Sequence, residues 1–258
     1  MIVRIVLILA ALCYYASFVL SLEKIKNRLN RPLVGKIVYI AGCCANIGVI
    51  LYNYISNIEQ RGVFYVPFVS VRQVMIFLAL CFLPVRLFIS KVCKCKGYDG
   101  YFLLAAAVFL TAPCFMDAGA VNFPPALQSV FFIPHIFCYM LSYALSAVGF
   151  LITLTALVKK EDHDDVIVSI IRVLFPFMTA GLACGAVWAD QVWGEFWAWD
   201  IKECWSLVTW LDYMLCLHLF KRAKLKKAAR ILVLTGFVLV MITFLFSNVL
   251  NVHSVHSY

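Results

Sequence analysis

The chain has 258 residues, of which 64% are hydrophobic and only 14% are charged, and its mean hydropathy is +0.95. An ordinary soluble domain is about 45–50% apolar and about 25% charged. The composition therefore excludes a soluble globular domain and a disordered chain, and it predicts an all-α polytopic membrane protein. The formal net charge of +9 is typical of nucleic-acid-binding proteins, so its meaning depends on where the basic residues lie.

Eight apolar stretches are long enough to cross a membrane as helices, which takes about 20 residues each. They cover residues 2–21, 37–57, 69–90, 101–120, 131–158, 169–189, 204–220 and 231–251. We expect the first to be a retained span, because no small-residue cleavage site followed by a soluble domain comes after it. We expect four helices in an N-terminal part over residues 1–125 and four in a second part over residues 126–258.

The basic residues predict the orientation of these spans. Eighteen of the 22 Lys and Arg residues fall in the segments that follow the first, third, fifth and seventh stretch. The remaining four are Arg4, Arg61, Arg72 and Lys202. Basic residues mark the cytoplasmic side of short loops, so both termini are expected outside. The charge then reflects topology and contact with membrane lipid, and no nucleic acid is implied.

All six Trp residues lie between positions 188 and 210, in an expected outward segment and its flanks. Its centre, WGEFWAWD from Trp193 to Asp200, places four aromatic rings in seven residues. Membrane-anchoring Trp residues would be spread over many helix ends. We therefore interpret this centre of the outer loop (residues 188–206) as a flat apolar platform for a large planar ligand, which Gly194 allows to approach closely. Asp200 and Glu203 have the spacing of a helix capping box, a role as well supported as ligand contact.

The pattern WGxxWxWDxKExxxLxxWL resembles the WWD signature of haem-handling membrane proteins, and its Lys-Glu continuation with the later Leu-His resembles the CcsA (ResC) family of cytochrome c biogenesis. The resemblance covers residues from about 130 to 258. Ile201 stands where the family usually has Pro, which loses preorganisation of the helix start but removes no ligand. The resemblance implies haem b as transported substrate, an apocytochrome c with Cys-x-x-Cys-His, and a CcsB (ResB)-like membrane partner.

Imidazole is a common axial ligand of haem iron, and His135 begins a stripe of polar and small residues that we expect to face the helix bundle. The stripe is Tyr139, Ser142, Ser146 and Gly149. By resemblance, His135 and His256 are the two axial ligands of an outer haem, and Trp193, Gly194, Trp197, Trp199 and Asp200 lie against it. His253, three residues before His256, is the alternative ligand.

Two further histidines are interpreted differently. His218 lies 14 residues beyond Cys204, about 21 Å along a helix. By resemblance it holds haem at an inner site, and a buried hydrogen-bonded histidine is the alternative. His163 lies in the charged run 159–165, which we interpret as solvated surface.

The leading hypothesis is transport of haem across the membrane and its presentation for covalent attachment to apocytochrome c, with holocytochrome c synthase activity only in complex with the partner. No catalytic acid or base is evident. Three alternatives stay open: a haem chaperone or exporter that forms no thioether, a b-type electron-transfer subunit, and a transporter of another substrate. The eleven Cys residues include no Cys-x-x-Cys, which disfavours a thiol relay. We expect a bacterial cytoplasmic membrane, with the Trp-rich loop facing the periplasm or outside, over a thylakoid.

Overall fold

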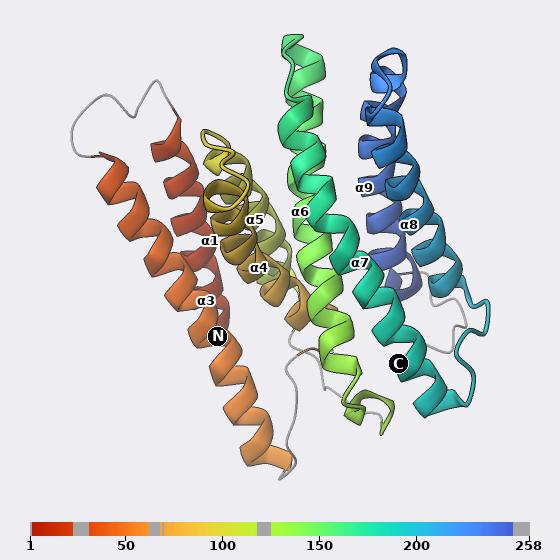
Figure 1. Cartoon of the computed structure of the whole chain (residues 1–258). Coiled ribbons are helices and arrows are strands. Elements are labelled where there is room, and N and C mark those ends of the chain that lie inside the picture. Colours follow the sequence, from red (N-terminus) through yellow and green to blue (C-terminus); the bar gives the residue numbers. More distant parts are fainter. Residues whose placement is uncertain (1, 23–30, 62–67, 69, 118–124, 250–258) are drawn as a thin grey trace. The chain divides into compact units, whose positions relative to one another are not determined.

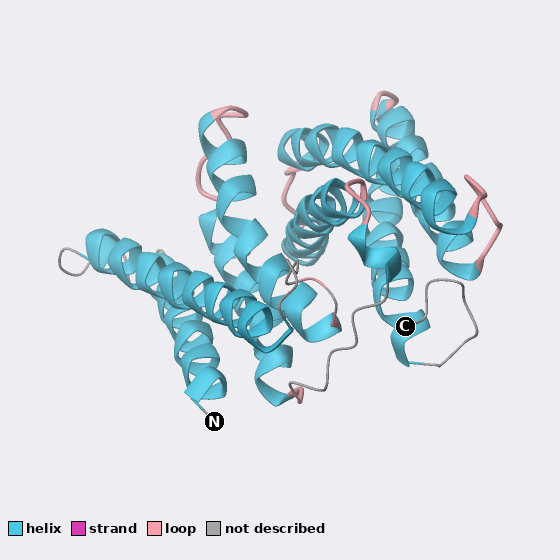
Figure 2. Cartoon of the chain, turned by 90° about the horizontal axis from the view of Figure 1, so that it is seen from below, coloured by secondary structure: helices cyan, strands magenta, loops and turns pink. Residues whose placement is uncertain are grey.

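The computed structural model describes all residues except 1, 23–30, 62–67, 69, 118–124 and 250–258. Its helices fall into two compact units, residues 1–123 (unit 1) and residues 124–258 (unit 2). The described residues form eight α-helices and two short 3-10 helices, and no strand occurs among them (Figure 1, Figure 2). The expected all-α class is confirmed.

Unit 1 contains four helices, which are α1 (Ile2–Ser21), α3 (Arg31–Arg61), α4 (Val71–Lys91) and α5 (Asp99–Phe115). Helix α1 packs against α3 and α5, and α4 packs against α5. The fully buried Asn46 of α3 joins three helices, because its amide donates to the Tyr14 hydroxyl of α1 at 3.4 Å and to the Ile76 carbonyl of α4 at 3.3 Å. Such interhelical hydrogen bonds fix the packing of membrane helices.

Unit 2 contains α6 (Phe132–Lys159), α7 (Asp164–Trp193), α8 (Ile201–Phe220) and α9 (Lys226–Val249), with the short helices η1 (Pro125–Gln128) and η2 (Ala223–Leu225). Helix α6 packs along α7 and α9, and α8 packs along α9 and α7. The expected stripe on α6 faces this core: Tyr139, Ser142, Ser146 and Gly149 are all buried. Ser146 and the Tyr213 hydroxyl of α8 are hydrogen-bonded at 2.6 Å.

Among the residues that the structure describes, six helical segments are long and apolar enough to cross a membrane, and they lie in α1, α3, α4, α6, α7 and residues 223–245. Helix α5 is apolar but has only 17 residues. Helix α8 contains Lys202, Glu203 and Asp212 and is not among the six. All eight predicted helices are therefore present, and six of them have the length and composition of spans.

The prediction of a helix over 101–120 is wrong at its end, because α5 ends at Phe115 and the next residue, Met116, has extended backbone with φ −83° and ψ 143°. Apolar composition alone does not distinguish a helix from an apolar connection. Pro113 lies two residues before the end of α5, and a proline lacks the N–H that an interior helix position donates.

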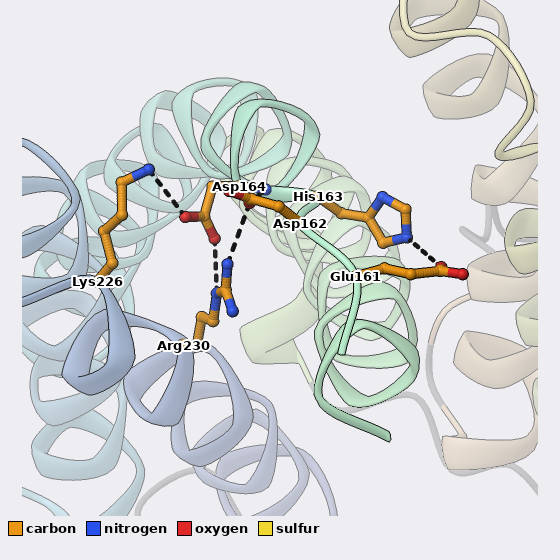
Figure 3. Close-up of polar contacts among 6 residues, drawn as sticks. All are labelled: Glu161, Asp162, His163, Asp164, Lys226 and Arg230. Carbon is orange, nitrogen blue, oxygen red and sulfur yellow. Dashed lines mark hydrogen bonds and ion pairs between the residues drawn. The ribbon is translucent and has the colours of Figure 1, made fainter. Parts of the chain in front are cut away.

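A buried acidic residue ties together the end of unit 2 where α7 and α9 begin (Figure 3). Asp164 is only 4% exposed, and its Oδ1 accepts from Arg230 Nε at 2.7 Å while Oδ2 forms an ion pair with Lys226 Nζ at 3.1 Å. Arg230 also donates to Asp162 Oδ1 at 3.0 Å. Interpreting the run 159–165 as solvated surface is therefore wrong for Asp164. His163 itself is half-buried and hydrogen-bonded to Glu161 at 3.0 Å.

Candidate functional site

His135 lies near the start of α6 and is half-buried beside α7. Its Nδ1 is 2.9 Å from the backbone carbonyl oxygen of Gly181. A carbonyl only accepts hydrogen bonds, so Nδ1 carries the proton and the neutral ring has its lone pair on Nε2. This is the tautomer in which Nε2 ligates a metal while Nδ1–H is held by a backbone carbonyl.

Trp188 of α7 connects this histidine to Trp193, the last residue of α7 before the Trp-rich loop. The His135 and Trp188 ring centroids are 5.5 Å apart, and the Trp188 and Trp193 centroids are 5.1 Å apart with an edge-on angle of 65°. Trp188 is 4% exposed, and its Nε1 donates to the Ala126 carbonyl of η1 at 2.7 Å. We call His135, Trp188 and Trp193 the aromatic bridge. It joins the predicted ligand on α6 to the first ring of the Trp-rich segment.

Glycines on α7 make room for the rings of α6. A Cβ atom built on Gly185 would lie 2.5 Å from His135 Nδ1, and one built on Gly181 would lie 2.9 Å from the Tyr139 ring. Neither glycine was predicted as part of the site, and Trp188 was predicted only as the first residue of the outer loop, not as a ligand contact. The available signal was the spacing of two glycines four residues apart, which allows close helix contact in membranes.

The loop between α7 and α8 begins at Gly194, whose φ of 81° is left-handed and whose N–H donates to the Asp190 carbonyl at 2.9 Å. A glycine in this conformation is a common end of a helix. Beyond it, Phe196 is 58% exposed and Trp199 is 69% exposed, while Trp197 is half-buried. The loop therefore exposes two aromatic side chains, those of Phe196 and Trp199, at the protein surface.

The predicted flat platform is wrong in its geometry. The Trp197 and Trp199 rings meet edge to face, with centroids 6.0 Å apart and planes at 82°. Aromatic quadrupoles favour such edge-on contact over coplanar arrangements. Trp210 lies apart from the loop, since its Nε1 donates to Thr179 of α7 at 2.9 Å within the helix packing. The Trp197 and Trp199 rings therefore meet at a steep angle and do not lie in one plane.

Trp197 has an unsatisfied donor. Its indole Nε1 is buried and has no hydrogen-bond partner within the described part of the chain. An unpaired buried donor typically costs about 1–3 kcal/mol. A ligand that combines an apolar ring with an acceptor oxygen at its edge would satisfy this atom, and haem, with two propionate groups on a planar macrocycle, has this chemistry.

Asp200 forms the predicted capping box at the start of α8. Its Oδ1 accepts from the Glu203 N–H at 2.9 Å, and Glu203 Oε2 accepts from the Asp200 N–H at 3.3 Å. The same Oε2 accepts from the Ala198 N–H at 2.9 Å. The structural role of Asp200 is therefore confirmed, and contact with a ligand stays a prediction.

His218 lies at the opposite end of α8 from the Trp-rich loop. It is 17 residues beyond Ile201, a separation of about 25 Å along the helix. The side chain is exposed, and its Nδ1 is 2.8 Å from the Met214 carbonyl of its own helix. The alternative of a buried histidine is therefore wrong. His218 is therefore too far from the Trp-rich end of α8 to bind the same ligand molecule as His135.

The two remaining predicted ligands, His253 and His256, lie outside the described residues, so their roles stay predictions.

All eleven cysteines carry free thiols. Burial, and the neighbouring thiol of Cys95, raise the pKa of the Cys93 thiol beyond the end of α4, which disfavours thiolate chemistry there. No three His, Cys, Asp or Glu side chains gather as a metal site in the described ranges.

Comparison with known proteins identifies relatives along most of the chain. A family profile described as cytochrome C assembly protein matches residues 3–254. The cytochrome c biogenesis protein CcsA of Chlamydomonas reinhardtii is 37% identical over 150 residues, and the match covers 52% of this chain and 42% of that protein. CcsA of Synechococcus sp. (strain CC9605) is 26% identical over 229 residues, and the match covers 70% of this chain and 75% of that protein.

A solved structure named Cytochrome c Heme Lyase CcmF shares the fold, with a TM-score of 0.67 and 17% identity over 94% of this chain and 46% of its own. The match to the Chlamydomonas relative spans less than half of that protein's length. The apolar helices and the relatives together indicate a multi-pass membrane protein. Because the family profile covers almost all of its residues, the chain belongs to the cytochrome c assembly protein family.

Proposed function

We propose that this chain carries haem b across a membrane and presents it for covalent attachment to apocytochrome c. The observation that carries the proposal is the aromatic bridge, in which His135 has its lone pair on Nε2 and contacts the Trp-rich loop through Trp188. Membership of the cytochrome c assembly family supports it, as does similarity to proteins named cytochrome c biogenesis protein CcsA.

The predicted histidines and the residues of the Trp-rich segment have distinct roles in this proposal. His135 and His256 hold the iron of the outer haem from opposite faces, as imidazoles commonly do. Trp193, Gly194, Trp197 and Trp199 contact the macrocycle, and the buried Nε1 of Trp197 donates to a propionate oxygen. His218, about 25 Å away along α8, holds haem at an inner site. The two sites mark the start and the end of a transport route.

The attachment step needs no redox cofactor. Each thiol of a Cys-x-x-Cys-His segment adds across a haem vinyl group, so that a carbon–sulfur bond forms and the thiol hydrogen moves to the neighbouring vinyl carbon. The chain contributes by positioning the haem and by ligating its iron. We propose that this synthase activity requires a CcsB/ResB-like membrane partner, and that both proteins act in a bacterial cytoplasmic membrane with the Trp-rich loop outside.

The test is the absorption spectrum of the chain purified from membranes together with its partner. We predict the spectrum of haem bound by two histidines, reduced roughly tenfold or more in His135→Ala because an axial ligand is lost. His163→Ala is the matched control, since His163 lies on the α6–α7 connection, and it should leave the spectrum unchanged. A wild-type spectrum in His135→Ala would remove His135 from the site.

Coexpression separates attachment from simple delivery. Cells that contain only this chain, its partner and an apocytochrome should accumulate covalent cytochrome c, detected by haem staining of denaturing gels. Bound haem without any covalent product in those cells would favour the haem chaperone or exporter.

A further inference from the structure

We infer that Gly185 is a positioning residue for His135, whose imidazole rests on the bare α7 backbone at that glycine and is thereby held in one orientation and one tautomer. The inference rests on the proposed function of His135 as an iron ligand. It adds a residue that never touches the haem and acts only through the histidine.

The His135 ring is enclosed on several sides. Its Nδ1 is 2.9 Å from the Gly181 carbonyl, and its ring packs edge-on against Tyr139 at 5.0 Å and beside Trp188 at 5.5 Å between centroids. A further contact is the backbone at Gly185, where an added Cβ would lie 2.5 Å from Nδ1 and 2.7 Å from Cε1. Non-bonded heavy atoms do not approach this closely, so any side chain at 185 must displace either the ring or the helix.

The helix has little freedom to move. Gly181 stands one turn earlier on the same face of α7, and a Cβ there would already lie 2.9 Å from the Tyr139 ring. The two helices are therefore close along a whole turn, and the ring, with only two side-chain torsions, is the part that yields. When it rotates away, Nδ1 loses the Gly181 carbonyl and Nε2 no longer points in its original direction.

Loss of such an outer partner of a metal-binding histidine typically costs about 10–100-fold in metal affinity. A general packing role for the glycine predicts something else, namely loss of folded protein whether or not His135 is present. Gly149 on α6 offers a matched control, because a Cβ there would lie 3.7 Å from Ile170 and Val233, an ordinary contact distance.

The experiment compares four variants of the chain purified with its membrane partner: Gly185→Ala, Gly149→Ala, His135→Ala and the double variant Gly185→Ala/His135→Ala. The bis-histidine absorption spectrum and the midpoint potential of the iron are measured with and without added imidazole. We expect Gly185→Ala to lose roughly tenfold in the bis-histidine signal and to shift the potential, and Gly149→Ala to match the wild type. The double variant should be no worse than His135→Ala, and imidazole should restore both equally, because the glycine acts only through the histidine.

The outcomes distinguish the proposed ligand role of His135 from the positioning role of Gly185. A wild-type spectrum in His135→Ala overturns the proposed role of His135 as an iron ligand. Loss in His135→Ala together with a wild-type spectrum and potential in Gly185→Ala overturns only the positioning inference. If imidazole restores His135→Ala but not the double variant, the glycine serves packing of unit 2, and the inference is likewise overturned.

Discussion

Trp199 combines two features that a stable protein ordinarily avoids. Its φ of 57° is left-handed, and its side chain is 69% exposed. A bulky residue in this region carries about 1–2 kcal/mol of backbone strain. Glu203 holds the strained residue from both sides, since its Oε2 accepts from the N–H groups of Ala198 and Asp200. Strain that the surroundings maintain is typical of functional sites.

Replacing Trp199 should separate this strain from the function of the ring. Trp199→Gly removes the ring and relieves the left-handed backbone, so we predict a free energy of unfolding higher by roughly 0.5–1 kcal/mol than in Trp199→Ala, which removes the ring and keeps the strain. Thermal unfolding of the two purified variants measures this difference. Both should retain less haem than the wild type. A Trp199→Gly protein less stable than Trp199→Ala would contradict the strain.

For individual residues, the sequence predicts interactions within one short segment but not interactions between helices. The capping box of Asp200 and Glu203 follows from residues three positions apart, and both of its hydrogen bonds are present. The bond from His135 to the Gly181 carbonyl joins residues 46 positions apart. It depends on the register of α6 against α7, which hydrophobic periodicity leaves open.

Among the helices of unit 2, the start of α9 is attached to the start of α7 by charge. Asp164 is the first residue of α7, where the helix dipole favours a carboxylate. Its partners Arg230 and Lys226 both lie in the first turns of α9 (Figure 3). The ion pairs therefore connect the starts of two helices that are distant in the sequence.

Asp164→Asn should destabilise this connection. Among the described residues, the substitution leaves Arg230, whose side chain is 20% exposed, with the solvent-facing Asp162 as its one carboxylate partner. We expect a loss of roughly 2 kcal/mol in the free energy of unfolding, below the roughly 3–5 kcal/mol of a broken fully buried pair. Asp162→Asn is the control, because Asp162 is 69% exposed and its loss should change stability by well under about 1 kcal/mol. Equal losses in the two variants, measured by thermal unfolding in detergent, would contradict a special role of Asp164.

The sequence predicted where the helices lie better than where they end. Helix α3 runs over Arg31–Arg61 where 37–57 was predicted, and α7 runs over Asp164–Trp193 where 169–189 was predicted. Hydropathy detects the part of a helix suited to hydrocarbon, whereas the helix continues into polar residues that cap it or pair with neighbours. Asp164 is such a residue.

In unit 2, the basic residues at one end of the helix bundle outnumber those at the other end. In unit 2, the α6–α7 connection and the η2 connection between α8 and α9 lie at one end, and the α7–α8 loop lies at the other (Figure 1). Lys159, Lys221 and Lys226 belong to the first end and Lys202 to the second. In unit 1, the expected outward residue Arg4 pairs with Asp117 at 3.0 Å, and Arg72 donates to the Pro113 carbonyl at 3.1 Å. Both contacts join the starts of α1 and α4 to the end of α5.

This separation makes the orientation of unit 2 in the membrane testable. Basic ends face the cytoplasm, so alkaline phosphatase, which is active only outside the cytoplasm, should be active when fused after Glu195 and inactive when fused after Glu161. A green fluorescent protein fused at the same two positions is the control and should give the opposite pattern. The reverse result would put His218 on the outer side and His135 inside. Haem would then reach the Trp-rich loop first, and delivery to an outer apocytochrome would have to start from the exposed end of α8.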